Sequence, residues 1–159
     1  MSKDKKDITL SKMNWLLFLL SRFKIPMIGY VRPKLLLLND EKVEVKIRLR
    51  RRSKNHLNSM YFGALAIGAD VAAGIHTFYF SEKLGKKVSF AFKGMNAEFI
   101  KRAESDIIFK CNEGDLIHKA ILKSDLEKVR INQTVLVNAV DSNNEVVAKF
   151  DMIVSVKVK

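Results

Sequence analysis

Asp70 is the residue whose position in the sequence most strongly suggests chemistry. It carries the only formal charge between Ser59 and Phe80, a stretch rich in glycine and alanine. On a helix its neighbours three and four positions away are Ala66, Ile67, Ala73 and Gly74. All four are apolar or small, so Asp70 has no helical salt-bridge partner. Its carboxylate must either meet a partner from another element or line a cleft, where it could act as a general base or nucleophile.

The other reactive residue types offer weaker candidates. The histidines share no metal-ligand spacing, and the single cysteine, Cys111, alternates with Ile107 and Phe109 as a small buried hydrophobe would. One cysteine excludes an intramolecular disulfide and a cysteine-rich zinc site. The sequence has neither a glycine-rich phosphate loop nor a Gly-x-Ser-x-Gly elbow. We expect no metal ion and no separate cofactor. For His56, His76 and His118 we expect structural or surface roles.

The positive charge is concentrated in the first third of the chain. The net charge is +12, and residues 1–60 alone hold 15 basic and 5 acidic residues. A cluster runs through Arg50, Arg51, Arg52 and Lys54. Such asymmetry is typical of a contact with nucleic acid, an anionic membrane surface or an anionic ligand, and also of a merely solvated face. Because residues 42–54 contain no aromatic side chain, single-strand nucleic-acid binding is disfavoured.

The N-terminus is expected to form an amphipathic helix. Lys3, Lys5 and Lys6 precede an apolar run over 15–20, but no small-residue cleavage site follows, and six apolar residues cannot span a bilayer. We predict a helix from Ser11, its cap, to Lys24, where Pro26 approaches. It could rest on a membrane surface or dock against the protein's own core, and we favour the core.

The rest of the chain predicts one antiparallel sheet and one long helix. Strands are expected over 34–38, 43–49, 88–99, 107–111, 135–139 and 146–156, with a short helix over 113–123. A helix is expected over 59–80, with Ser59 as its cap and Gly85 in the exit loop. Its three glycines indicate that backbone approaches it closely on more than one side.

The segment from Asn55 to Asp70 resembles the start of the central helix in hot-dog-fold acyl-CoA thioesterases of the phenylacetyl-CoA thioesterase-like branch. That branch shows an Asn, then His-Gly-Gly, then a small-residue helix with an Asp nine residues after the His. Asn55, Gly63 and Asp70 match, whereas Tyr61 replaces the His and Phe62 the first Gly. The wider pattern also resembles a poorly characterised sister family of the same superfamily. The resemblance covers about residues 30–158.

The resemblance implies an α+β hot-dog fold, in which an antiparallel sheet wraps around a long central helix, here with an extra N-terminal helix. It implies that Asp70 activates water or attacks the thioester carbonyl, often in a site completed by the partner subunit, and that Asn55 orients water or substrate. The backbone N–H of Phe62, helped by Gly63, would stabilise the oxyanion. Tyr61 and Ser89 become neighbours of the substrate. Arg52, Lys54, Lys86 and Lys87 would attract the phosphates of coenzyme A near the entrance, as would Arg50 and Arg51.

We therefore expect an N-terminal helical extension (1–30) and a hot-dog domain (31–159) in a cytoplasmic homodimer or homotetramer. The expected function is hydrolysis of an acyl-CoA or acyl-carrier thioester, with the coenzyme A moiety part of the substrate. The alternative is a non-catalytic module that binds an acyl ligand, nucleic acid or anionic lipid. We expect no membrane span.

Overall fold

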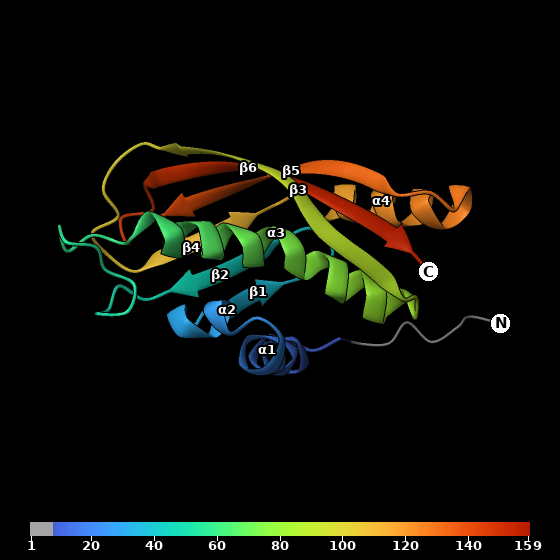
Figure 1. Cartoon of the computed structure of the whole chain (residues 1–159), viewed down its shortest axis with the longest axis horizontal. Helices are drawn as coiled ribbons and strands as arrows, with labels where there is room; N and C mark the ends of the chain where they lie inside the picture. The colour runs from blue at the N-terminus through green and yellow to red at the C-terminus, as the bar shows by residue number, and fades with distance from the viewer. Residues whose placement is uncertain (1–7) are drawn as a thin grey trace.

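The computed structural model describes residues 8–159, so Lys3, Lys5 and Lys6 lie outside the described residues. The elements in chain order are α1 (Leu10–Leu19), η1 (Leu20–Lys24), α2 (Pro26–Val31), β1 (Lys34–Leu38), β2 (Val43–Ile47), α3 (Phe62–Leu84), β3 (Val88–Phe99), β4 (Ile107–Cys111), α4 (Gly114–Glu127), β5 (Ile131–Val140) and β6 (Val146–Val158). The sheet curves around α3, with α1 and α2 below that helix and α4 at one end of the sheet (Figure 1). This is the predicted hot-dog architecture.

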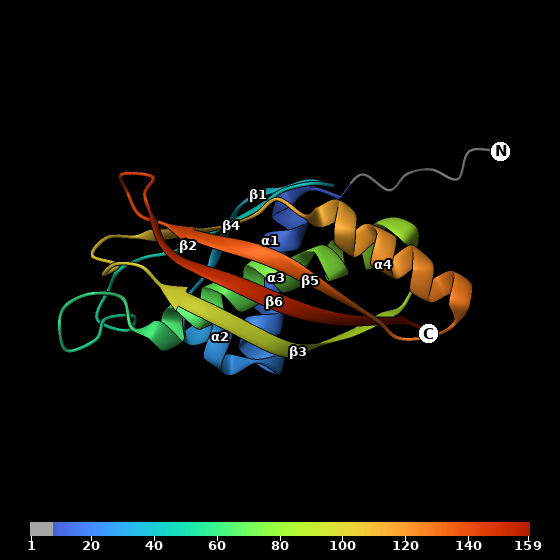
Figure 2. The ribbon, with the colours of Figure 1, turned by 90° about the horizontal axis from the view of Figure 1, so that it is seen from above.

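The sheet has six antiparallel strands in the order β1-β2-β4-β5-β6-β3. Its period-two pattern is confirmed, because the odd-numbered residues of β2 and β4, from Val43 to Ile47 and from Ile107 to Cys111, are fully buried. Figure 2, which views the molecule from above, shows α3 running beneath the strands. The inner face of the sheet and the buried face of α3 therefore form one core.

Small residues let α3 lie unusually close to the sheet. A Cβ atom added at Gly68 would lie 2.2 Å from the ring of Phe109 on β4, and one at Gly74 would lie 3.2 Å from Phe90 on β3. The close approach does come from more than one element, but side-chain rings make it and not the predicted backbone. Within the described part of the chain, α3 is the one helix long and apolar enough to cross a membrane, but 67% of its most apolar window is buried inside the fold. It is the core helix of the sheet.

Both long helices begin at residues other than those predicted. The N-terminal helix is capped by Thr9, whose Oγ1 accepts a hydrogen bond from the Lys12 N–H, and not by Ser11. The central helix begins at Phe62 and not at Ser59, because the Ser59 side chain is engaged in the preceding loop. It continues past 80 to Leu84, where Gly85 adopts a positive φ of 62°.

Other boundaries also differ from the prediction. Helix α2 was not expected, because Pro26 reads as the end of a helix, whereas proline is also favoured in the first turn of one. Strand β2 stops at Ile47 because the Leu49 N–H donates to the Asp106 carboxylate. Strand β5 begins four residues before Val135. Helix α4 extends to Glu127.

The two edges of the sheet differ in how far they are blocked from pairing with a further strand. At the β1 edge, the Asn14 side chain of α1 both accepts from the Leu35 N–H (3.1 Å) and donates to the Leu35 carbonyl (3.0 Å). This amide occupies backbone groups that another strand would use. At the other edge, β3 pairs only with β6 among the described residues. Twelve residues of extended backbone are thus open to a further strand.

We expect the protein to self-associate, because natural proteins rarely leave so long an edge unpaired. Light scattering at micromolar concentration should give a mass of at least two chains of 18.2 kDa each. A stable monomer would contradict this expectation.

Candidate functional site

The carboxylate of Asp70 is half-buried on α3 and has no charged partner. Across residues 8–159, no hydrogen bond or ion pair reaches it, and burial is the only cause of its altered titration. This burial raises the pKa of Asp70 from 3.8 to about 6. The group is therefore ionised at neutral pH but poorly hydrated, which makes it a stronger base than an exposed aspartate.

Asp70 lies in the wall of an apolar cavity of about 400 Å³, which we call the Asp70 cavity. Its walls come from the N-terminal helices, α3 and β3, and consist of Leu17, Leu20, Ile25, Ile28, Asp70, Val71, Gly74, Ile75, Phe78, Phe90, Ala91 and Phe92. The rings of Phe78 and Phe90 meet edge to face at 5.2 Å, as do those of Phe90 and Phe92 at 6.0 Å. The cavity thus pairs one carboxylate with apolar and aromatic walls.

Sequence reasoning missed most of these wall residues. The alternation of Phe90 and Phe92 on a strand was a usable signal, since it placed both rings on one face. For the wall supplied by Leu17, Leu20 and Ile28, the sequence held no signal, because it does not show where the N-terminal helices dock.

A second, more open hollow meets the first at Asp70. It is lined by residues of α3, β3 and β6, namely Ala66, Ile67, Asp70, Phe92, Lys93, Gly94, Met95 and Met152. Four of these belong to the unpaired edge strand β3. The carboxylate therefore lies between an apolar cavity and a surface where another strand could add to the sheet.

The N-terminus of α3 presents the predicted oxyanion donors at the surface. The N–H groups of the first helical turn, which includes Phe62 and Gly63, lack partners within the helix. Tyr61, the residue before the helix, provides no side-chain cap. Its ring lies over Gly63, where an added Cβ would come within 2.3 Å of it. Glycine is required at position 63 for this contact, and Tyr61 crowds the helix end.

Asn55 holds the loop that leads into α3. Its Oδ1 accepts hydrogen bonds from the N–H groups of Leu57 (2.9 Å) and Ser59 (3.1 Å), and its Nδ2 donates to the Ser59 hydroxyl (3.0 Å). The loop is tied down further by the Tyr61 N–H, which donates to the Ser53 carbonyl at 2.7 Å. The contacts of Asn55 thus position the helix start and do not reach toward Asp70.

The structure does not bring Phe62 and Asp70 together within one chain. They are eight residues apart on one helix, a distance of about 12 Å along the axis. A single thioester carbonyl cannot contact both groups. If both act on one substrate, they must come from different subunits.

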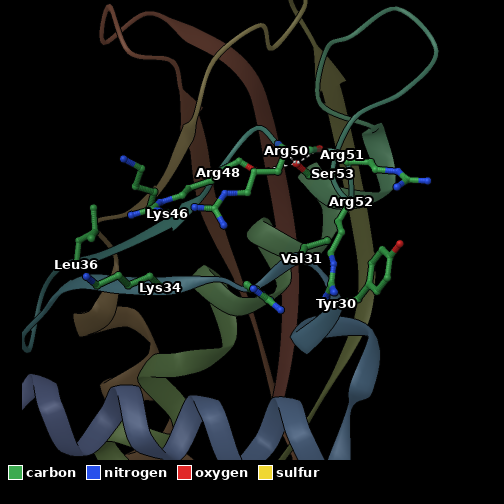
Figure 3. Close-up of a pocket in the computed structure, with 11 residues that line it drawn as sticks. Tyr30, Val31, Lys34, Leu36, Lys46, Arg48, Arg50, Arg51, Arg52 and Ser53 are labelled. Carbon is green, nitrogen blue, oxygen red and sulfur yellow. Dashed lines mark hydrogen bonds between the residues drawn. The ribbon is translucent and has the colours of Figure 1, made fainter.

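The basic cluster forms a pocket of about 490 Å³ at the ends of β1 and β2, which we call the basic pocket (Figure 3). It is lined by seven cationic side chains and no carboxylate: Arg32, Lys34, Lys46, Arg48, Arg50, Arg51 and Arg52. Arg52 lies 5.3 Å from the ring of Tyr30 on α2. Residues 42–54 themselves contain no aromatic side chain, and a separate helix supplies this ring.

The remaining predicted binding residues are dispersed. Lys54 follows the basic pocket and forms an isolated bridge with Met60. Lys86 and Lys87 follow the far end of α3, which is about 35 Å long, and Lys86 pairs with Asp125. Within one chain they cannot share an entrance with Arg52. Ser89, on β3, is not among the residues that line the Asp70 cavity.

The histidines and the cysteine have the expected structural settings. His76 is fully buried, its Nε2 lies 2.9 Å from the Asn39 carbonyl, and burial lowers its pKa. His118 stacks on Phe80, and His56 is exposed. Burial raises the pKa of the Cys111 thiol to about 11, so it is not a nucleophile at neutral pH.

Comparison with solved structures shows the same fold over nearly the whole chain. A Shewanella oneidensis protein to which thioesterase activity is ascribed superposes with a TM-score of 0.81 at 13% identity, covering 92% of this chain and 99% of its own. A Pseudomonas aeruginosa protein of unknown function, to which the same activity is ascribed, gives 0.79 at 19% identity, covering 98% and 99%. A thioesterase of Haemophilus influenzae gives 0.68 at 13% identity, covering 97% and 94%.

At these identities, the structural likeness establishes the hot-dog fold and leaves the activity open. A comparison with curated protein sequences found no relative. The family described as domain of unknown function (DUF4442) matches residues 13–156, nearly the whole chain. The protein therefore belongs to the DUF4442 family.

Proposed function

We propose that this protein hydrolyses the thioester of an apolar acyl group carried by coenzyme A or a carrier protein. One observation carries the proposal: a half-buried carboxylate without a partner, with a pKa of about 6, lies where an apolar cavity meets an open hollow. The cavity would hold the acyl chain, and the hollow would admit the thioester and water. The proteins of similar fold to which thioesterase activity is ascribed support this choice.

In the proposed reaction, Asp70 takes a proton from a water molecule while the oxygen of that water attacks the thioester carbonyl carbon. The tetrahedral intermediate collapses with cleavage of the carbon–sulfur bond, releasing a carboxylic acid and a thiolate, which takes back the proton held by Asp70 to leave as the thiol. The backbone N–H groups at the start of α3, including that of Phe62, would stabilise the oxyanion. Because they lie about 12 Å from Asp70 in the same chain, they would come from a second subunit. Direct attack by the Asp70 carboxylate is the other route to the same products.

The resemblance to the phenylacetyl-CoA thioesterase-like branch belongs to this proposal. Phe78, Phe90 and Phe92 would pack against an aryl or medium-length acyl group. The seven cations of the basic pocket would attract the phosphates of coenzyme A through Arg52 and its neighbours. The direct test is hydrolysis of a panel of short, medium and aryl acyl-CoAs, followed by release of free thiol.

Non-catalytic binding of an acyl ligand is the second candidate. The ring of Tyr61 over Gly63 and the bulk of Phe62 crowd the helix end where the carbonyl would bind. Acyl-CoA that binds without turnover across the panel would support this function and contradict hydrolysis.

The pH dependence of hydrolysis should follow the ionisation of Asp70. Only the carboxylate accepts a proton, and burial raises its pKa to about 6. We therefore expect kcat/KM to fall about tenfold per pH unit below about pH 6 and to level off above it. The measurement is kcat/KM between about pH 4.5 and 8. A profile without a break in this range would contradict the role of Asp70.

A further inference from the structure

Exposed large hydrophobic side chains are denser along α1, η1 and α2 than in any other stretch of comparable length within residues 8–159. Six large side chains between 15 and 30 are exposed: Trp15, Phe18, Phe23, Ile25, Met27 and Tyr30. The exposed fractions of Trp15, Phe23 and Met27 are 61%, 69% and 72%. Single exposed hydrophobic residues are ordinary, but so dense a group marks a contact surface.

The segment that forms this face also carries net positive charge, and Glu82 of α3 pairs with one of its cations, Lys12. No acidic residue occurs between Asp7 and Asp40, whereas Arg22, Lys24 and Arg32 are exposed there. Arg22 lies 5.7 Å from the ring of Phe23, so cationic and aromatic groups are interleaved. The partner should therefore be both anionic and apolar.

A hollow of about 570 Å³ joins this face to the basic pocket. Phe18, Arg22, Tyr30, Arg32 and Arg52 line it above an apolar floor that includes Leu17 and Pro26. Tyr30, Arg32 and Arg52 also line the basic pocket, so the two hollows adjoin and combine exposed rings with guanidinium groups. Figure 3 shows Tyr30 and Arg52 side by side. Such side chains occupy the headgroup region of a bilayer, where rings meet the acyl boundary and arginines meet phosphates.

We propose that the face formed by α1, η1 and α2 docks on an anionic phospholipid bilayer. A second copy is a poorer occupant, because a two-fold contact through this face would set its cations against each other. Single-stranded nucleic acid would match the cations and rings, but it gives no partner to the aliphatic side chains of Ile25 and Met27. An anionic bilayer offers partners to the cations, the aromatic rings and the aliphatic side chains.

Docking would also place the Asp70 cavity beside the membrane. Ile25 is 43% exposed on the docking face and at the same time lines that cavity. An acyl chain in the bilayer would thus have a short route to Asp70. This consequence rests on the proposed function, whereas docking itself does not and is measured without any substrate.

Trp15 makes docking directly observable, because it is the only tryptophan of the chain and lies on this face. Vesicles of phosphatidylcholine mixed with phosphatidylglycerol should shift its emission to shorter wavelength and sediment with the protein. Phosphatidylcholine vesicles alone should do neither, and high salt should weaken the effect. Equal binding to both lipids would overturn the proposal, as would no binding to either.

Two pairs of substitutions separate the apolar from the cationic contribution to vesicle binding. Phe23→Ser with Met27→Ser should weaken binding about tenfold or more by removing buried apolar area. Arg22→Gln with Lys24→Gln should weaken it about 25-fold, since each cation near an anionic leaflet contributes roughly fivefold. None of these four residues lines the Asp70 cavity or belongs to the proposed catalytic groups, so hydrolysis of short acyl-CoAs should persist.

The matched controls lie on α4. Leu122→Ser with Leu126→Ser removes exposed leucines, and Lys119→Gln with Lys123→Gln removes exposed cations. Both should bind vesicles as the unaltered protein does. Equal losses in test and control pairs would overturn the proposal. The proposal would also be overturned if the unaltered protein did not bind vesicles and Phe23→Ser with Met27→Ser dissociated the oligomer. Binding to random single-stranded DNA in place of vesicles would overturn it as well.

Discussion

Replacing Asp70 with asparagine is expected to lower kcat for thioester hydrolysis by about 10²–10⁴, the usual loss when a general base is removed. The amide preserves the shape of the side chain but cannot accept the proton of the attacking water. Acyl-CoA binding should survive, because the apolar walls of the Asp70 cavity and the basic pocket remain. The measurement is steady-state release of free thiol from the best substrate of the panel, together with its dissociation constant.

Two further variants serve as controls for Asp70→Asn. Asp151→Asn removes the same charge from an exposed position on β6 and should leave turnover unchanged. Asn55→Ala should reduce kcat less than Asp70→Asn, because Asn55 acts through the loop that positions α3. Undiminished turnover in Asp70→Asn would show that another group performs the chemistry.

The fold could be predicted from the sequence because its main signals are local. Alternation at Val43, Val45 and Ile47 fixes a half-buried strand, and the small residues around Gly68 fix a closely packed helix. Element ends were less predictable where a cap depends on a neighbouring segment. Ser59 has the residue type of a helix cap, but Asn55 takes its hydroxyl.

The candidate site was predictable only in part. Asp70 could be found from the absence of polar neighbours on its own helix, and among the described residues no hydrogen bond or ion pair reaches it from elsewhere. Its cavity could not be found, because a third of the wall comes from the N-terminal helical segment, which is remote in sequence. The cation–ring contact between Arg52 and Tyr30 was hidden for the same reason.

The spacing of Phe62 and Asp70 along α3 bears on whether one chain can form a complete site. The resemblance implies one site that is often completed by a partner subunit, and helix geometry is consistent with this, because it places the two residues about 12 Å apart in a single chain. The open β3 edge beside Asp70 supplies a physical reason for a second subunit. Self-association and catalysis are therefore linked expectations, and a monomer would count against both.

Asp70→Asn should also make the protein more stable at neutral pH. The pKa of Asp70 is about 6 in the folded chain, against an ordinary value of 3.8, so the folded state holds this proton more tightly than the unfolded state. The free energy of unfolding therefore falls as the pH rises from about 4 to about 6, and the full penalty persists above that range. Its size is about 2–3 kcal/mol, from the shift between these two pKa values.

Asparagine carries no charge at any of these pH values and escapes the penalty. The variant should therefore melt roughly 5–10 °C above the unaltered protein at pH 8, and the difference should vanish near pH 4. Thermal unfolding at both pH values, with Asp151→Asn as the control, measures this. Equal stability at pH 8 would show that the folded protein, in its assembled state, gives the Asp70 carboxylate a partner or full hydration. A gain in stability that accompanies the loss of turnover would mean that the fold tolerates a costly carboxylate at this position because the reaction needs it.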